Sequence, residues 1–282
     1  MMNKWVLGAR PRTLPAAVAP VLVATALARS EWSIQPALLA LFVSLTLQIG
    51  VNYANDYSDG VRGTDADRVG PTRLTASGLA TPRAVKTAAF ICFALSAIAG
   101  LILALQTSWW LIAVGFIAIL AAWGYTGGKS PYGYRGLGEV SVFLFFGVVA
   151  TVGSYFVQTQ RLTLQAFIAS VPVGALACAL LAINNLRDRA KDEVVGKKTL
   201  AVRLGDKGAR ALFITLIFSA HLFALATLRP WSALTFLALP LTVKLAREVS
   251  SGVQGMELIP VLAKTGRLQL VFATLFSLGL VL

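Results

Sequence analysis

The chain has 282 residues, of which 57% are hydrophobic and only 13% are charged, and its mean hydropathy is +0.74. A water-soluble domain of this size cannot bury so much apolar surface in one core, so the composition excludes a soluble enzyme, a disordered protein and a disulfide scaffold. In a membrane protein, the net charge of +13 indicates cytoplasmic loops that face anionic lipid rather than binding to nucleic acid.

Several apolar segments approach the length of about 20 residues that a helix needs to span a bilayer. In chain order they cover residues 13–29, 34–55, 85–106, 108–125, 137–157, 163–185, 208–228, 231–247 and 265–282. None of them alternates with period two, which argues against a membrane β-barrel. The sequence therefore predicts an all-α integral membrane protein, in which residues 1–282 form a single domain built as a bundle of nine transmembrane helices.

The loop charges predict the orientation of this bundle. With the N-terminus in the cytoplasm, 22 of the 25 Lys and Arg residues fall in cytoplasmic segments, and the outer loops keep only Arg29, Arg161 and Arg229. This asymmetry follows the positive-inside rule. The first segment could also be interpreted as a signal peptide, but Pro15 and Pro20 are unsuited to its apolar region. We therefore expect a multi-pass protein of the cytoplasmic membrane, with the C-terminus outside.

The acidic residues gather at the cytoplasmic ends of two predicted helices. Seven of the twelve lie in two stretches, namely Asp56, Asp59, Asp65 and Asp67, and then Asp188, Asp192 and Glu193. Asn55 and Asp59 are four residues apart, as are Asp188 and Asp192, so each pair shares a helical face if its helix continues that far. The corresponding positions of the two stretches suggest an internal duplication, with one acidic corner in each half.

Two carboxylate-bearing helix ends that face each other would form an oxygen-rich site. Such a site suits Mg²⁺, which proteins hold with one or two carboxylates together with substrate phosphates. Basic residues flank both stretches, and this mixture of acid and base indicates a metal-bridged diphosphate. One other interpretation stays open, because charges at helix ends are often only solvated and locally paired. Residues 56–60 also match the beginning of the CDP-alcohol phosphotransferase motif, but the match fails beyond these five residues.

At these residues the sequence resembles the UbiA superfamily of intramembrane prenyltransferases, whose members have nine helices and two aspartate-rich motifs, NDxxDxxxD and DxxxD. Residues 55–59 match the start of the first motif, and residues 188–192 match the second. The third aspartate of the first motif would stand at Gly63, whereas Asp65 follows two residues later. The resemblance implies a UbiA-like fold with Asp-rich cytoplasmic loops at about 56–84 and 186–207.

Four stretches, 10–22, 55–78, 125–140 and 184–205, are most similar to the 1,4-dihydroxy-2-naphthoate polyprenyltransferases of menaquinone synthesis. This resemblance implies a Mg²⁺-dependent enzyme whose active site faces the cytoplasm of a menaquinone-making prokaryote. It would transfer a polyprenyl group from its diphosphate to 1,4-dihydroxy-2-naphthoate, releasing diphosphate and CO₂ and giving demethylmenaquinone. The alternatives are a UbiA-type enzyme with another acceptor, such as 4-hydroxybenzoate, and a secondary transporter, which also shows intramembrane acids and duplicated halves.

The resemblance also implies roles for individual residues. We expect Mg²⁺, as two ions bridging the diphosphate, to be held by Asn55, Asp59, Asp65, Asp188 and Asp192, with Asp56 either as a further metal ligand or as a support for the ligands. The expected substrate-binding residues are Asn52, Arg68, Arg73, Tyr125, Arg135, Asn184, Arg187, Lys197 and Lys198. Lys129 joins Asp59, Asp188 and Asp192 as an expected catalytic residue. For Lys129 and Arg135, the simpler interpretation is charge that sets the membrane topology.

Overall fold

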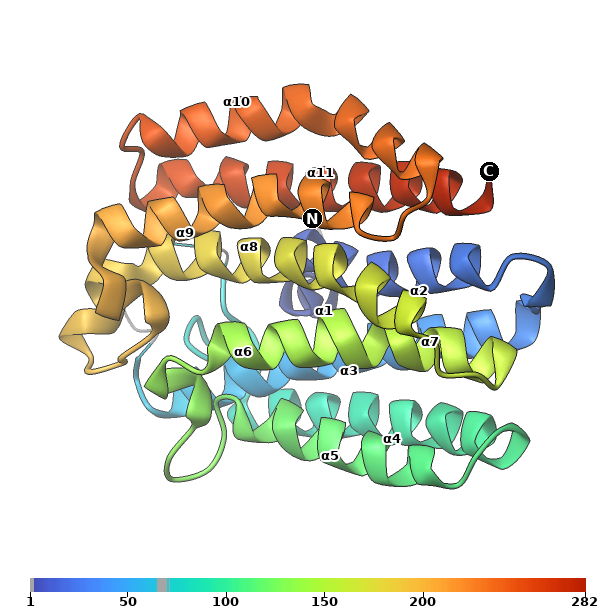
Figure 1. Ribbon diagram of the computed structural model, residues 1–282. Coiled ribbons are helices and arrows are strands. Elements are labelled where there is room, and N and C mark those ends of the chain that lie inside the picture. The colour runs from blue at the N-terminus through green and yellow to red at the C-terminus, as the bar shows by residue number, and fades with distance from the viewer. Residues whose placement is uncertain (1–2, 65–69, 71) are drawn as a thin grey trace.

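Helices account for all the regular structure of residues 3–64, 70 and 72–282, which are the residues that the computed structural model describes. They lie side by side and run along a common direction (Figure 1). In chain order the elements are α1 (Lys4–Ala9), η1 (Pro11–Thr13), α2 (Pro15–Ala28), η2 (Arg29–Glu31), α3 (Ile34–Val61), α4 (Pro82–Gln106), α5 (Trp110–Gly124), η3 (Tyr132–Arg135), α6 (Gly138–Val142), η4 (Phe143–Val149), α7 (Ala150–Thr159), α8 (Leu164–Val194), α9 (Leu200–Leu225), η5 (Pro230–Ala238), α10 (Leu239–Ser250), η6 (Gly255–Glu257) and α11 (Leu258–Val281).

Each of the predicted apolar segments contains a helix, and the all-α membrane fold is confirmed. Within the described part of the chain, six helices are long and apolar enough to cross a membrane. A seventh span results if Lys4–Thr13 and Pro15–Glu31, which are bent by 53° relative to each other, count as one. The helix Trp110–Gly124 is apolar but shorter. A count of nine spans and the orientation in the membrane stay predictions.

Two of the predicted helix ends were too early, and this matters for the site. α3 continues to Val61 and α8 to Val194, so the acidic stretches begin on helices and not in the loops predicted at 56–84 and 186–207. α9 and α11 begin seven or more residues before the predicted starts at 208 and 265. Hydropathy detects only the apolar middle of a helix, whereas backbone hydrogen bonding continues through polar residues that project beyond it.

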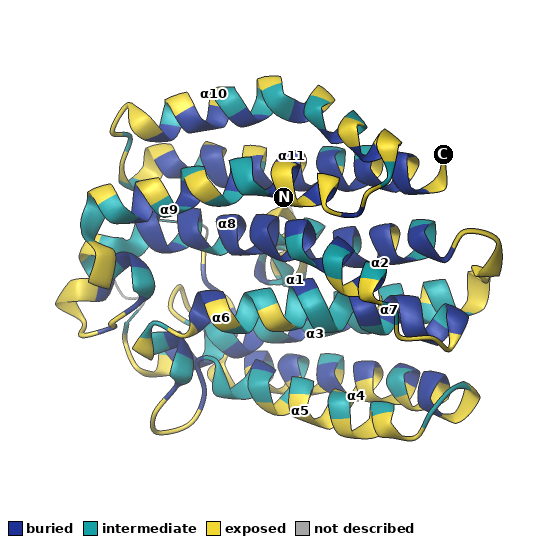
Figure 2. Cartoon of the chain, viewed as in Figure 1, coloured by how far each residue is buried: buried dark blue, intermediate teal, exposed yellow. Residues whose placement is uncertain are grey.

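α8 is the central helix of the bundle. In its most apolar stretch, 78% of the residues are buried, against 22% in the corresponding stretch of α3 (Figure 2). Small residues let its neighbour approach closely, since a Cβ added to Gly147 would lie only 2.6 Å from the Cα of Gly174. By contrast, α4 and α5 expose large apolar side chains such as Ile98 and Phe116, as helices that contact lipid do.

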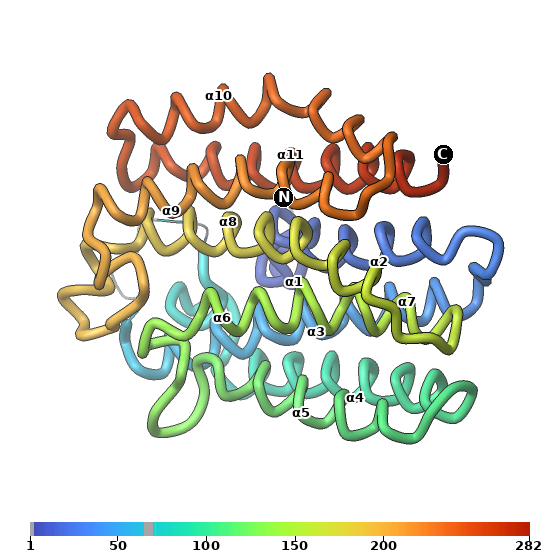
Figure 3. The backbone as a smooth tube through the Cα atoms, in the orientation of Figure 1, coloured from blue at the N-terminus to red at the C-terminus, as the bar shows by residue number. Residues whose placement is uncertain are grey.

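The acidic ends of α3 and α8 lie at the same end of the bundle. The tube view shows that the chain leaves α3, α5 and α8 on this side (Figure 3). The helix α3 packs against α4, and α8 packs against α9, so each acidic end belongs to a pair of neighbouring helices. This arrangement brings together two sequence stretches that are about 130 residues apart.

The middle of the rod Gly138–Thr159, which is made of α6, η4 and α7, is wound more widely than an α-helix. Its residues Phe143–Val149 form a π-helical segment, η4, between α6 and α7. Wide turns of this kind are rare and are frequently found at functional sites. Phe145, Phe146 and Val149 of this segment line the cavity described below.

Candidate functional site

A cavity of about 660 Å³ lies between α2, α3, α4, α5, the rod α6–α7 and α8. Its character changes along the helices that form it. On α3 the lining residues change from Val43 and Leu47 to Asn55 and Asp59. On α8 they change in the same direction, from Ala177 and Leu180 to polar and charged residues. The cavity is therefore apolar within the bundle and strongly polar at the acidic end.

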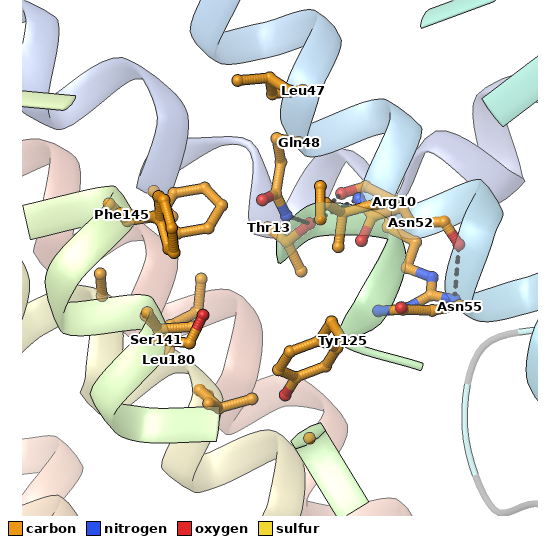
Figure 4. A pocket seen from close by; sticks show the side chains of 18 of the residues that line it. Arg10, Thr13, Leu47, Gln48, Asn52, Asn55, Tyr125, Ser141, Phe145 and Leu180 are labelled. Carbon is orange, nitrogen blue, oxygen red and sulfur yellow. Dashed lines mark hydrogen bonds between the residues drawn. The ribbon is translucent and has the colours of Figure 1, made fainter. Parts of the chain in front are cut away.

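One face of α3 supplies a polar ridge to the cavity. Gln48, Asn52, Asn55 and Asp59 are spaced by four, three and four residues, which places them on the same side of a helix. All four line the cavity, and Figure 4 shows the first three facing Ser141, Phe145 and Leu180 across it. The predicted helical face of Asn55 and Asp59 is thus observed, because α3 does continue that far.

Lys197 links the two acidic stretches. Its Nζ atom lies 3.1 Å from Oδ1 of Asp59 and 4.0 Å from Oδ1 of Asp192. Burial, the largest single influence, lowers the pKa of the Lys197 ammonium, but the carboxylates of Asp59 and Asp192 and the Tyr134 side chain outweigh it, so the pKa is raised overall. The side chain therefore stays charged at neutral pH and offsets the repulsion between the two carboxylates.

Tyr134, which the sequence interpretation missed, completes this link. Its hydroxyl donates a hydrogen bond to Oδ1 of Asp59, and the ring centre lies 4.5 Å from Lys197 Nζ and 5.4 Å from the Arg62 guanidinium. Arg62 in turn donates to the carbonyl oxygens of Thr126 and Gly128. Burial, and after it the Asp59 carboxylate, raises the pKa of the Tyr134 hydroxyl, which therefore remains a donor.

On α8, three of the predicted residues form one hydrogen-bonded group. Arg187 donates through Nε and Nη2 to the two carboxylate oxygens of Asp188, at 2.8 and 2.7 Å. The same Nη2 also donates to Oδ1 of Asn184, at 2.9 Å. This two-point pairing fixes the plane of the guanidinium. The exposed fractions of the Arg187 and Asp188 side chains are 2% and 10%, so both charges lie inside the site.

Asp56 has a different environment from the other acids of its stretch. It is fully buried, and its two carboxylate oxygens accept hydrogen bonds from the backbone N–H groups of Leu74 and Thr75, at 2.8 and 2.9 Å. Both oxygens are thus already used to hold the chain after α3 against the helix. Of the two roles available to Asp56, metal ligand or support, this geometry favours support.

Replacing Asp56 with Asn should therefore destabilise the protein rather than weaken metal binding. An amide offers only one acceptor oxygen and leaves one buried N–H unpaired, which costs about 1–3 kcal/mol. We expect a lower apparent thermal midpoint in detergent, with the Mg²⁺ dependence of activity unchanged. Asp59→Asn is the matched comparison on the same helix and should instead abolish activity, since Asp59 is a proposed metal ligand. A normal midpoint with an altered Mg²⁺ requirement in Asp56→Asn would make Asp56 a ligand instead.

The other predicted residues divide between the cavity and its surroundings. Asn52, Arg73 and Tyr125 line the cavity, while Lys129, Arg135 and Lys198 are exposed on the loops and are not among the lining residues that the structure describes. Asp65 and Arg68 lie outside the described residues. Asn55 accepts a hydrogen bond from the Thr126 hydroxyl at 2.7 Å, which orients its amide.

Lys191 is a further residue that the sequence interpretation did not assign to the site. It lines the cavity, one residue before Asp192, and its Nζ atom is buried without a hydrogen-bond partner among the described residues. A buried ammonium group requires a compensating charge or acceptor. Its position at the acidic end of the cavity suits an anionic ligand. The sequence signal was its place three residues after Asp188, close to the face that carries the acids.

The donor set at this end fits a divalent cation that a ligand helps to hold. In the described part of the chain, no three His, Cys, Asp or Glu side chains lie close enough together to hold a metal ion by themselves. Mg²⁺ does not need such a group, because it is commonly held by one or two carboxylates and by phosphate oxygens of the substrate. Asp59 and Asp192 already share one cation, the Lys197 ammonium, and Asn55 adds an amide oxygen nearby on α3.

Comparison with known proteins agrees with this geometry. The model of the UbiA prenyltransferase family matches residues 17–251. A 1,4-dihydroxy-2-naphthoate octaprenyltransferase from Mycobacterium tuberculosis is 52% identical over 276 residues, which are 96% of this chain and 94% of that protein. The protein of the same name from Escherichia coli is 40% identical, with 99% of this chain and 95% of that protein covered.

Solved structures of UbiA homologs are similar to this chain in fold. A solved UbiA homolog from Archaeoglobus fulgidus, bound to GPP and Mg²⁺, is similar with a TM-score of 0.72 over 99% of both chains, although only 15% of the residues are identical. A UbiA homolog from Aeropyrum pernix is similar with a TM-score of 0.70, covering 99% of this chain and 98% of that one at 15% identity. Since the family model covers most of the sequence and the relatives match it almost from end to end, the chain belongs to the UbiA prenyltransferase family.

Proposed function

We propose that this protein transfers a polyprenyl group from its diphosphate to 1,4-dihydroxy-2-naphthoate, with loss of diphosphate and CO₂, to give demethylmenaquinone. The observation that carries the proposal is the match to naphthoate octaprenyltransferases over nearly the whole chain, at 52% and 40% identity. The cavity supports it, because a polar end with acids and bases suits a metal-bound diphosphate and the apolar remainder suits an isoprenoid tail.

We assign the Mg²⁺ site to the polar ends of α3 and α8. Asn55, Asp59, Asp188 and Asp192 would hold the metal together with diphosphate oxygens, and Asp65 is a further candidate. Mg²⁺, proposed as two ions, would supply positive charge that neutralises the leaving diphosphate. The similar structures of UbiA homologs bound to GPP and Mg²⁺ or to DMAPP and Mg²⁺ support a metal-dependent diphosphate site in this fold.

The chain's own cations would bind the rest of the diphosphate charge. Lys191, Lys197, Arg187 and Arg73 all line the polar end of the cavity. Charge-assisted hydrogen bonds from such groups stabilise the charge that develops as the carbon–oxygen bond breaks. Arg68 is a further candidate. Since Lys129, Arg135 and Lys198 are exposed outside the cavity, we give Lys129 and Arg135 the simpler role of setting the membrane topology.

The apolar part of the cavity would protect the allylic carbocation until it reacts. Ionisation leaves a cation at C1 of the prenyl chain, and water would capture it if water were present. Side chains such as Leu47, Leu103, Phe145 and Val149 exclude water there. The cation then forms a carbon–carbon bond with the electron-rich naphthoate ring. The ring carbon that gains the prenyl group loses its proton. The neighbouring carbon loses the carboxylate as CO₂ and takes up one proton, so that charge and atoms balance.

This protein is a multi-pass membrane protein, and we propose that its polar site opens to the cytoplasm. The diphosphate and the naphthoate would then reach the site from the cytoplasm, while the tail remains among lipid-facing helices. The 22-to-3 distribution of Lys and Arg supports this orientation. We also propose that residues 1–282 act as one domain. The position of the acids at helix ends, away from the middle of the bundle, disfavours the transporter alternative.

The assay that tests the function uses the purified protein in detergent with geranylgeranyl diphosphate, 1,4-dihydroxy-2-naphthoate and Mg²⁺. We expect prenylated naphthoquinone after work-up, complete loss of product when EDTA is added, and recovery when Mg²⁺ is restored in excess. A parallel reaction contains 4-hydroxybenzoate as the only acceptor and should give no product. If only 4-hydroxybenzoate gave product, the protein would be a UbiA-type enzyme that acts on this acceptor. Prenyl transfer that survives EDTA would contradict the role of the metal.

A further inference from the structure

The polar ridge of α3 continues beyond the acidic end of the cavity, into a second polar cluster that the diphosphate site does not use. It consists of Arg10, Thr13, Gln48 and Asn52, and we call it the Arg10 cluster. All four residues line the cavity, and Figure 4 shows them together on one wall. Asn52 lies seven residues before Asp59, which corresponds to about 10 Å along the helix axis.

The Arg10 cluster is held in place by hydrogen bonds between α3 and the segment that precedes α2. Nη2 of Arg10 donates to the carbonyl oxygen of Asn52, at 3.2 Å. The Thr13 hydroxyl accepts from the side-chain amides of Gln48 and Asn52, at 3.0 and 3.1 Å. The same hydroxyl donates to the carbonyl oxygen of Arg10. The guanidinium is therefore anchored before any ligand arrives.

The backbone at Arg10 is itself unusual. It ends α1 with φ 53° and ψ 70°, in the left-handed region that residues other than glycine rarely adopt. Such conformations persist only when the surrounding structure enforces them, and they are concentrated at functional sites. Here α1 is fixed to α3, because Asn52 donates to the Ala9 carbonyl at 2.8 Å and the Tyr53 hydroxyl donates to the Trp5 carbonyl at 2.7 Å.

We propose that the Arg10 cluster binds the carboxylate and a ring hydroxyl of the aromatic acceptor. The inference rests on the proposed prenyl transfer and specifies which residues recognise the second substrate. A guanidinium matches a carboxylate through two parallel hydrogen bonds. The amide carbonyls of Gln48 and Asn52 are acceptors suited to a phenolic hydroxyl. The aromatic ring would then lie between the α3 ridge and the wall that carries Phe145.

A carboxylate suits this cluster better than the diphosphate does. Within the described lining of the cavity, the cations at the acidic end are Lys191, Lys197, Arg187 and Arg73. Arg10 lies beside the neutral side chains of Gln48, Asn52 and Thr13, and the other arginine of its segment, Arg12, is exposed. Neutral amides supply shape and direction but little charge, which fits one carboxylate and not a diphosphate of several negative charges. Asn55, a proposed Mg²⁺ ligand, follows Asn52 by three residues, or about 4.5 Å along the helix axis, so the two sites adjoin each other along α3.

The test compares binding of two naphthalene probes that do not react, 1-hydroxy-2-naphthoate and 1-naphthol, which differ by the carboxylate. In the protein in detergent, Arg10→Gln should weaken binding of the naphthoate by about 10- to 100-fold, the range expected for a charge-assisted hydrogen-bonded pair. Binding of 1-naphthol should be unchanged. Arg10→Lys should recover part of the loss, because it keeps the charge without the two-point geometry. Arg83→Gln, an exposed arginine at the start of α4, is the control and should match the unmodified protein.

Kinetics then separate this inference from the proposed function. In the transfer assay, Arg10→Gln should raise KM for the naphthoate and leave KM for the prenyl diphosphate unchanged. Equal weakening of both probes, an unchanged naphthoate affinity, or a raised KM for the prenyl diphosphate would overturn the assignment of Arg10 to the acceptor. If Arg10→Gln does not fold, Arg10→Lys gives the same comparison. Absence of transfer by the unmodified protein would refute the proposed function, whereas the carboxylate dependence of binding is measured without turnover.

Discussion

Replacing Asp192 with Asn should reduce prenyl transfer by at least about 1000-fold while leaving the protein folded. The substitution removes one of the two carboxylates that face the shared cation, and the loss of an electrostatic contact to a developing charge typically costs 10²–10³ in kcat, before any loss of metal. Asp192 lies at the end of the cavity, and Lys197 Nζ is 4.0 Å from its carboxylate. The measurement is single-turnover product formation at saturating Mg²⁺, together with the thermal midpoint.

The neighbouring acid provides the control for this variant. Glu193 pairs with Arg189 at 3.5 Å and is 63% exposed, so Glu193→Gln removes the same charge from the same turn of α8 but outside the cavity. We expect it to retain full activity. If Asp192→Asn also retained full activity, the carboxylates at this end would not hold the metal, and the proposed site would be wrong.

Replacing Lys191 with Met should separate activity from stability. The buried Nζ atom has no hydrogen-bond partner among the described residues, so an apolar side chain of similar length removes a desolvation cost and should leave the thermal midpoint unchanged or raise it. Transfer should nevertheless fall by about 100-fold, because one cation no longer meets the leaving diphosphate. The fall should appear in kcat/KM for the prenyl diphosphate.

Lys207→Met removes an exposed cation from α9 and should change neither activity nor midpoint. A large drop in the midpoint of Lys191→Met would show that the amine is structural, and full activity would show that the diphosphate does not contact it. Both variants replace a lysine with methionine, so any difference in activity or midpoint between them is due to the position of the lysine.

The acidic end of the site could be predicted from the sequence, because residue spacing along one helix is a local property. Four-residue spacing places Asn55 with Asp59, and Asp188 with Asp192, on single helical faces, and both helices do continue through these residues. The ends of the helices were harder to predict, because hydropathy records where lipid lies and not where backbone hydrogen bonding stops. α3 and α8 therefore extend into what was predicted as loop.

The parts of the site that depend on contacts between distant segments could not be predicted. Tyr134 reaches Asp59 across 75 residues, and Lys197 does so across 138. Lys197 was expected at the diphosphate from the motif, but its bridge between two carboxylates follows only from the placement of the segment after α8 against the end of α3. Asp56 and Asp59 look equivalent in the sequence, and only the backbone N–H groups of Leu74 and Thr75 distinguish their roles.

The wide turn in Gly138–Thr159 sets how much of that rod borders the cavity. Ser141, Phe145, Val149, Gly153 and Val157 all line it, at intervals of four residues. In a pure α-helix, each interval of four would advance the side chain by about 40°, so that Val157 would stand about 160° from Ser141. The slower winding of Phe143–Val149 compensates for much of this rotation. Deleting one residue there would turn everything that follows by about 100°. Substitutions in this segment can therefore change the shape of the cavity. An insertion or deletion would instead turn the side chains that follow it away from the cavity.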